Sequence, residues 1–195
     1  MINAVILAAG ESKRMGKPKP LLKFNDKTFL EQIISVLKSS DIDTITVVLG
    51  AHAETIRQSI DLSETNVVIN NNYKKGQLSS LIAALQNIPD DTEAILLCLV
   101  DHPFITKDLI NSIVAGFKKT ASPIIVPVFN KQRGHPTLFA KSLFHELLNA
   151  PEDQGARYVL YSNEDKVTEL ETTEPAARIS IDTPADYKSH FAQDP

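Results

Sequence analysis

The chain has 195 residues, of which 43% are hydrophobic and 23% charged, so its composition is that of an ordinary globular protein. Its net charge of −4 argues against a nucleic-acid partner, and its one cysteine, Cys98, allows no intramolecular disulfide. No apolar run approaches the roughly 20 residues that span a bilayer, and the N-terminus lacks signal-peptide features. We therefore expect a cytoplasmic protein with no membrane partner.

Apolar strand-like segments alternate with segments of helical periodicity along the chain. Strands are expected at 2–8, 44–50, 66–70, 94–100, 123–129 and 137–140, with a further strand ending at Ile181. Helices are expected at 28–39, 52–60, 77–87, 108–118, 141–149 and 153–161, and from Pro184 onward. Thr28 and Glu31 predict a capping box at the first helix. Prolines within 123–129 indicate an edge strand or an irregularity.

Continuous apolar strands separated by helices predict an α/β fold, with a doubly wound, mostly parallel sheet sandwiched by helices. No break in composition divides the chain, so we expect a single domain over residues 1–195. In such sheets, ligands bind beyond the carboxyl ends of the strands. The loops that follow Ala8, Leu49 and Val100 are therefore the first places to look for a site.

The loop after the first strand is basic although the protein as a whole is acidic. Gly10 and Gly16 allow tight turns and a close approach of backbone N–H groups to phosphate oxygens. Arg14 and Lys19 can neutralise a triphosphate, the first through its planar fork and the second as a point charge. These features favour a site for a small polyanion, and a solvated basic loop without a ligand is the alternative.

Two well-known phosphate loops do not fit this segment. A P-loop has four residues between its glycines and Ser or Thr after the lysine, whereas here five residues separate the glycines and Pro18 follows Lys17. A dinucleotide fingerprint requires three closely spaced glycines, and only Gly10 lies near this turn.

The loop resembles the signature of nucleotidyltransferases with the nucleotide-diphospho-sugar transferase fold, whose pattern is L-A-[AG]-G-x-x-x-R-M-G-x-x-K. The matching residues are Leu7, Ala8, Ala9, Gly10, Arg14, Met15, Gly16 and Lys19. Later motifs resemble the MobA-like branch, particularly the molybdenum cofactor cytidylyltransferases. These motifs are GQLSSL at 76–81, DHPF at 101–104, GHP at 134–136, DQGAR at 153–157 and IDTP at 181–184. The resemblance spans about residues 4–187.

This resemblance implies a nucleotide site made by Leu7, Ala8, Ala9, Gly10, Arg14, Gly16 and Lys19. It also implies that Ser79 and Ser80 contact the base or the ribose, although serines near a helix start are also ordinary N-cap residues. Related guanylyltransferases have glycine at the position of Ala9. The added methyl group favours the smaller pyrimidine, so we expect CTP as donor rather than GTP.

Asp101 ends an apolar strand, where a carboxylate without a partner would be costly. A Mg²⁺ ion that bridges it to substrate phosphates is a natural partner, and we expect Mg²⁺ as the cofactor, held by Asp101 and Asp182. Arg14, Lys19 and Asp101 are the predicted catalytic residues. The alternatives are that Asp101 only caps the turn after it and that Asp182 is the N-cap of the helix starting at Pro184.

On the acceptor side, the resemblance implies roles for His135 and Arg157. A histidine before proline is often structural, and Arg157 has an alternative ion-pair partner four residues earlier in Asp153. The chain departs from the family pattern at two positions. Val100 stands where glycine is common, and Ser180 stands where the molybdopterin cytidylyltransferases commonly have an acidic residue.

Together these features predict Mg²⁺-dependent transfer of CMP from CTP to a phosphorylated acceptor, with release of pyrophosphate. By resemblance the acceptor is molybdopterin, and delivery of the product implies a transient apo-molybdoenzyme partner. The alternatives are GTP as donor, or an alditol, methylerythritol or sugar phosphate as acceptor. A non-catalytic nucleotide-binding accessory protein is an alternative of another class. The joint presence of Arg14, Lys19, Asp101 and Asp182 argues against it.

Overall fold

The computed structural model describes residues 1–192, so residues 193–195 at the end of the predicted domain lie outside the described part. Its centre is a sheet with the strand order β10-β7-β9-β6-β1-β4-β5, and β8 pairs with β7. The strands of this sheet are β1 (Ile2–Ala8), β4 (Thr44–Leu49), β5 (Asn66–Ile69), β6 (Ala94–Leu99), β7 (Ile124–Phe129), β8 (Gln132–Arg133), β9 (Thr137–Ala140) and β10 (Val167–Glu171). A small hairpin of β2 (Lys23–Phe24) and β3 (Lys27–Thr28) lies apart from it.

The helices are α1 (Phe29–Lys38), α2 (Ala53–Ser59), α3 (Gln77–Leu85), α4 (Lys107–Thr120), α5 (Phe144–Leu148), α6 (Ala156–Ser162) and α7 (Pro184–Phe191). Short 3₁₀ turns are η1 (Lys19–Leu21), η2 (Tyr73–Lys75), η3 (Lys141–Leu143), η4 (Glu164–Lys166) and η5 (Pro175–Ala177). Among residues 1–192, no helix has the length and apolar character needed to cross a membrane.

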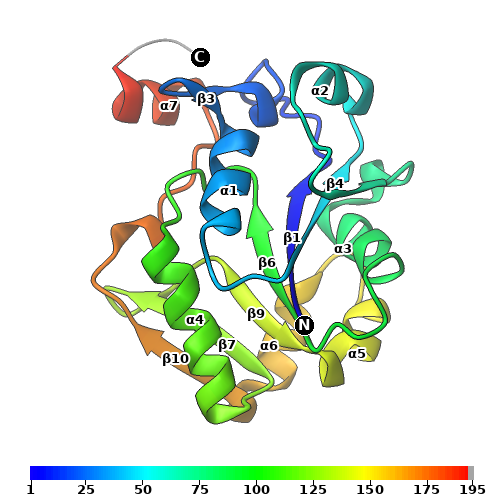
Figure 1. Cartoon of the computed structure of the whole chain (residues 1–195), viewed down its shortest axis with the longest axis vertical. Helices are drawn as coiled ribbons and strands as arrows, with labels where there is room; N and C mark the ends of the chain where they lie inside the picture. The colour runs from blue at the N-terminus through cyan, green and yellow to red at the C-terminus, as the bar shows by residue number, and fades with distance from the viewer. Residues whose placement is uncertain (193–195) are drawn as a thin grey trace.

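The sheet is mostly parallel, which confirms the predicted fold class. Strand β1 pairs in parallel with β4 and β6, β4 with β5, and β7 with β10. Strand β9 runs antiparallel to both of its neighbours, β6 and β7. The carboxyl ends of β1, β4 and β6 consequently meet at one edge, which is at the top of Figure 1.

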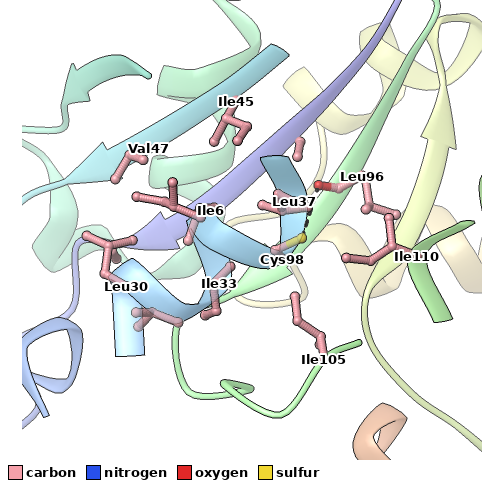
Figure 2. Close-up of a cluster of buried hydrophobic side chains, with 14 of the residues drawn as sticks. Ile6, Leu30, Ile33, Leu37, Ile45, Val47, Leu96, Cys98, Ile105 and Ile110 are labelled. Atoms are coloured by element: carbon pink, nitrogen blue, oxygen red, sulfur yellow. Dashed lines mark hydrogen bonds between the residues drawn. The ribbon is translucent and has the colours of Figure 1, made fainter. Parts of the chain in front are cut away.

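Both faces of the sheet are covered because side chains alternate along each strand. On one face Ala4 and Ile6 of β1 pack with α1 and α4, and on the other Val5 and Leu7 pack with α3, α5 and α6 (Figure 1). Figure 2 shows the first of these layers, where Ile33 and Leu37 of α1 lie over β1 and β6. Such burial on both faces explains the nearly continuous apolar strands of the sequence.

Helix α1 forms as its sequence predicts. The Thr28 hydroxyl accepts a hydrogen bond from the Glu31 backbone N–H at 3.3 Å, and the Glu31 carboxylate accepts one from the Thr28 N–H at 2.7 Å. This capping box satisfies two N–H groups that lack helical partners. All five of its predicted apolar residues are buried: Phe29, Leu30, Ile33, Ile34 and Leu37.

Three of the predicted elements are wrong in detail. Strand β7 forms where it was predicted but is interior, with β10 and β9 on its two sides, so an edge position, one of the two interpretations of its prolines, is wrong. Helix α6 begins at Ala156 because the three residues before it form a turn that ends at Gly155, with φ +62°.

The strand expected to end at Ile181 is also absent, and the last strand is instead β10, a mostly polar segment. Ile181 is apolar because it packs in a cluster with Met15, Leu22, Phe29 and Tyr187. Its N–H donates to the Asp101 carbonyl at 2.8 Å, outside any strand ladder. This cluster fixes the segment before α7 against the loop that follows β1, and so brings the two loops together.

Candidate active site

A cavity of about 380 Å³ lies at the carboxyl ends of β1 and β6, and we name it the loop cavity because residues 7–20 form much of its wall. Nine predicted site residues line it: Leu7, Ala8, Ala9, Gly10, Arg14, Lys19, Ser80, Asp101 and Asp182. Gly16 and Ser79, which were also predicted, are not part of its wall. The structure thus brings together residues from four distant parts of the chain.

Lys19 is the centre of an ion-pair network in this cavity. Its Nζ donates to Asp101 Oδ2 at 3.0 Å and to Asp182 Oδ1 at 2.7 Å, and the lysine side chain is only 12% exposed. Arg14 Nη2 reaches the same oxygen of Asp182 at 2.9 Å. The hydrogen bond from Lys19 lowers the pKa of Asp182, and the charges of Lys19 and Arg14 act in the same direction.

Backbone geometry fixes the loop that carries these cations. Ser12 has φ +54°, and its carbonyl accepts hydrogen bonds from Met15 and Gly16 at 2.9 and 3.1 Å. The Ser12 hydroxyl accepts a further bond from the Lys19 N–H at 3.0 Å. Gly16, with φ +75°, therefore serves the turn itself, and Ser12 is a supporting residue that the sequence reading missed.

Ala9 lies in a tightly packed corner of the loop cavity. It is 4% exposed, and its carbonyl accepts a hydrogen bond from Ala51 at 3.0 Å. A Cβ at Gly50 would lie 2.9 Å from the Ala9 Cβ and 2.7 Å from the Tyr73 Cβ. Gly50 thus allows Ala9 and Tyr73 to pack at the cavity wall, and neither Gly50 nor Tyr73 was predicted as a site residue.

The two predicted serines have different positions. Asn70 Nδ2 donates to the hydroxyls of Ser79 and Ser80 at 2.9 and 3.0 Å, which ties α3 to the loop after β5. Ser80 is buried and lines the loop cavity, whereas Ser79 lines a separate small cavity. The N-cap of α3 is Gly76, so neither serine caps the helix.

The residues of the loop cavity fit a hard divalent cation. The carboxylates of Asp101 and Asp182 converge on one cation, the Lys19 ammonium, so both oxygens face the same space. Within residues 1–192 there is no group of three or more His, Cys, Asp and Glu that could hold a metal by itself. Two carboxylates completed by substrate phosphates are the arrangement that Mg²⁺ commonly uses.

The alternative structural role for Asp182 is wrong. The N-cap of α7 is Thr183, whose hydroxyl accepts from the Asp186 N–H at 3.2 Å while the Asp186 carboxylate accepts from the Thr183 N–H at 2.8 Å. This capping box leaves the carboxylate of Asp182 directed into the loop cavity.

A second cavity of about 790 Å³ adjoins the first, since Leu7 and Gln77 line both. We name it the arginine cavity because three arginines, Arg133, Arg157 and Arg178, contribute to its wall. The predicted acceptor residues His135 and Arg157 both lie there. In the described chain Arg157 makes no ion pair with Asp153, so its charge is available to a ligand.

His135 forms a pair with His102, which sequence reasoning left without a role. Their ring centroids are 5.1 Å apart, and the Nδ1 atom of each is buried with no hydrogen-bond partner among residues 1–192. Burial lowers the pKa of both imidazoles, for His135 to about 4, so both are neutral near pH 7. The position of His102 directly after Asp101 was the signal that could have identified it.

A close backbone contact positions His135. Its N–H donates to the Ala177 carbonyl at 2.8 Å, and the preceding residue, Gly134, lies so near that a Cβ there would be 2.2 Å from the same oxygen. Glycine is thus required at this point for the two chain segments to approach.

Comparison with known proteins places the chain among nucleotidyltransferases. The family model described as "MobA-like NTP transferase domain" matches residues 4–167. The molybdenum cofactor cytidylyltransferase of Escherichia coli (strain K12) is 28% identical over 187 residues, covering 95% of this chain and 93% of that protein. Nicotine blue oxidoreductase of Paenarthrobacter nicotinovorans is 25% identical over 194 residues, covering 93% and 92%.

Among solved structures, Rv0371c from Mycobacterium tuberculosis H37Rv is 29% identical, with a TM-score of 0.86 and 98% of each chain covered. A second structure of that protein is a complex with manganese and has a TM-score of 0.83 at 28% identity, again with 98% of each chain covered. The relatives carry different names, so similarity alone does not identify the substrates. The matched model spans most of this sequence, and the chain belongs to the MobA-like NTP transferase family of nucleotidyltransferases.

Proposed function

We propose that the protein transfers CMP from CTP to the phosphate group of a small acceptor and releases pyrophosphate, with Mg²⁺ as cofactor. The observation that carries the proposal is the convergence of Lys19, Asp101 and Asp182 in a cavity walled by the signature loop. A protein that only binds nucleotide would not need two carboxylates beside the loop of residues 7–20.

In the proposed reaction, an oxygen of the acceptor phosphate attacks the α-phosphorus of CTP in line with the leaving group. A phosphorus–oxygen bond forms between acceptor and CMP, and the bond between the α- and β-phosphates breaks. Such transfers depend mainly on positioning and on neutralising charge. They require no covalent enzyme intermediate.

Each part of the loop cavity has a role in this proposal. The N–H groups around Gly10 and the fork of Arg14 hold the β- and γ-phosphates. Lys19 leaves its carboxylate partners and neutralises charge at the α-phosphate. Asp101 and Asp182 would hold Mg²⁺, which supplies charge neutralisation at the phosphate oxygens when it is bound.

Ala9 supports CTP as the donor, because its methyl group is packed at the wall of the loop cavity by Gly50 and Tyr73 and reduces the space for a base. The acceptor would occupy the arginine cavity, where His135 and Arg157 lie. Similarity to a molybdenum cofactor cytidylyltransferase supports molybdopterin as this acceptor, with a transient apo-molybdoenzyme partner for the product.

The test is a pyrophosphate-release assay with Mg²⁺ and molybdenum-loaded molybdopterin, run in parallel with CTP and GTP. We expect release with CTP and little with GTP. Release with GTP alone would contradict the role given to Ala9. CTP binding without release would contradict the acceptor and direct the search to alditol, methylerythritol or sugar phosphates.

A further inference from the structure

The arginine cavity carries more positive charge than its own carboxylates neutralise. Its wall has two acidic side chains, Asp153 and Glu169, and four cationic ones, Lys131, Arg133, Arg157 and Arg178. Only Arg133 is neutralised, because it pairs with Glu164 and Glu169. The other three cations form no ion pair within the described residues, so the cavity is suited to an anion.

Arg178 is held in place without being neutralised. Its Nη1 donates to the Arg133 carbonyl at 2.6 Å, and this bond to an uncharged oxygen leaves its positive charge uncompensated. A guanidinium group has five N–H donors. No other hydrogen bond of this group is seen within residues 1–192, so most of its donors remain available at the cavity wall.

The backbone joins Arg178 to His135. Ala177, directly before Arg178, accepts the N–H of His135 at 2.8 Å, and Gly134 allows the two segments to touch. Two hydrogen bonds therefore connect residues 133–135 with residues 177–178. The imidazole of His135 and the guanidinium of Arg178 are therefore carried by one hydrogen-bonded junction between these segments.

Arg157 reaches the same place from α6. It lines the arginine cavity together with His135 and Arg178, and burial keeps the pKa of His135 low. His135 is neutral near pH 7, so the two guanidinium groups supply the charge of this place. The ring of His102 packs against that of His135, and Asp101, the residue before His102, lines the loop cavity.

We propose that Arg178, together with Arg157 and His135, forms an anion site that binds the phosphate group of the acceptor. Planar guanidinium forks match the oxygens of a phosphate monoester, and two of them suit its dianion. This inference rests on the proposed function, because it assigns the acceptor phosphate to the cavity beside Asp101. It adds Arg178 as a binding residue and a phosphate monoester as the ligand class.

The test uses the full chain with the loop cavity filled by Mg²⁺ and α,β-methylene-CTP, an analogue that cannot release pyrophosphate. Inorganic phosphate is then titrated, and its binding is followed by phosphorus NMR. Three variants are compared with the wild type: Arg178→Gln, Arg178→Lys, and the control Arg57→Gln. The control removes the same charge from an exposed position of α2 outside both cavities.

We expect Arg178→Gln to weaken phosphate binding about tenfold, since charge-assisted hydrogen bonds are lost. Arg178→Lys keeps the charge but not the fork and should fall between this variant and the wild type. Arg57→Gln should bind phosphate as the wild type does. Unchanged affinity for the nucleotide analogue shows that the Arg178 variants remain folded.

Three results would overturn the anion site. They are an unchanged phosphate affinity in Arg178→Gln, an equal loss of phosphate affinity in Arg57→Gln, and no phosphate binding by the wild-type protein. If the wild type fails to bind the nucleotide analogue, the proposed function is wrong. The phosphate titration without the analogue then still decides whether Arg178 belongs to an anion site.

Discussion

The loop cavity and the arginine cavity adjoin, but the chain builds them in different ways. Much of the loop cavity wall comes from one continuous segment, residues 7–20, whose turns are closed by Ser12 and Gly16. The arginine cavity is assembled from residues in separate segments near 77–81, 131–139, 153–161 and 169–178. The loop of residues 7–20 in the first cavity is therefore a local structure, completed by distant residues such as Asp101 and Asp182, whereas the second cavity as a whole is a product of tertiary contacts.

This difference has a physical consequence for function. Phosphates are the same in every nucleotide, so a local loop of N–H groups and cations can bind them in many proteins. An acceptor must be distinguished by its shape and charge, which requires side chains from several elements. The comparison predicts that changes in one cavity affect one substrate and leave the other nearly untouched.

The largest effect is expected in the loop cavity, at Asp101. Asp101→Asn removes a charge that would hold the metal and leaves Lys19 with one carboxylate. We expect kcat to fall by at least about 100-fold while nucleotide binding is mostly retained. Pyrophosphate release and nucleotide titration measure the two quantities, with Asp165→Asn, an exposed carboxylate outside both cavities, as control. Unchanged turnover would remove Asp101 from the mechanism.

Gly134→Ala should distort the arginine cavity and leave the loop cavity unchanged. The new Cβ would lie 2.2 Å from the Ala177 carbonyl oxygen, so the two segments must separate. We expect a loss of about 1–3 kcal/mol in the free energy of unfolding, as overpacking commonly causes, and a higher KM for the acceptor. Denaturant unfolding and steady-state kinetics measure these effects. A raised Kd for CTP with an unaltered acceptor KM would refute the separation of the cavities.

Gly10→Ala is the matched change in the loop cavity. A Cβ at Gly10 meets no atom within 4 Å, so the free energy of unfolding should change by less than about 0.5 kcal/mol. The methyl group nevertheless occupies space at the phosphate loop, and we expect about tenfold weaker CTP binding. Calorimetric titration with CTP and thermal unfolding test this. Full CTP affinity would show that phosphate does not approach Gly10.

Ala9→Gly tests whether the methyl group of Ala9 determines which nucleotide is the donor. Removing one methyl group from the wall beside Tyr73 enlarges the space for a base, and one such group is worth at most about 1–3 kcal/mol. We expect the ratio of kcat/KM for CTP over GTP to fall about tenfold, with no change in acceptor KM. If the ratio of kcat/KM for CTP over GTP is unchanged, other residues determine the choice of donor.

The smallest effect is expected from pH. The pKa of His135 lies at about 4 in the folded protein, below its ordinary 6.5, because the ring is buried. As pH falls below 6.5, His135 becomes protonated in the unfolded state but stays neutral in the folded state, so the free energy of unfolding decreases. The slope for this group is at most about 1.4 kcal/mol per pH unit. His135→Asn should flatten the unfolding free energy between pH 6.5 and 5.5, and an unchanged slope would contradict its burial as a neutral group.

Sequence reasoning predicted the fold and half of the residues that line the loop cavity. The reason is that α1, β1 and residues 7–19 are specified by local patterns: a capping box, apolar periodicity and a fixed spacing of glycines and cations. It misplaced the last strand because the alternation around Ile181 reflects packing in a small cluster with Tyr187, not a strand ladder. The polar strand β10 was missed because its side chains are only partly buried.

The sequence by itself determined the α/β class, the turns and cations of the loop after β1, and the two carboxylates that follow apolar segments, since these depend on neighbours along the chain. Only the tertiary structure decided that Lys19 joins Asp101 to Asp182, that His102 pairs with His135, and that Arg178 and Arg157 line one cavity. These contacts join residues tens to more than a hundred positions apart, through backbone approaches such as that of Gly134 to Ala177. No local sequence pattern specifies these contacts, because they result from how the helices and loops pack against the sheet.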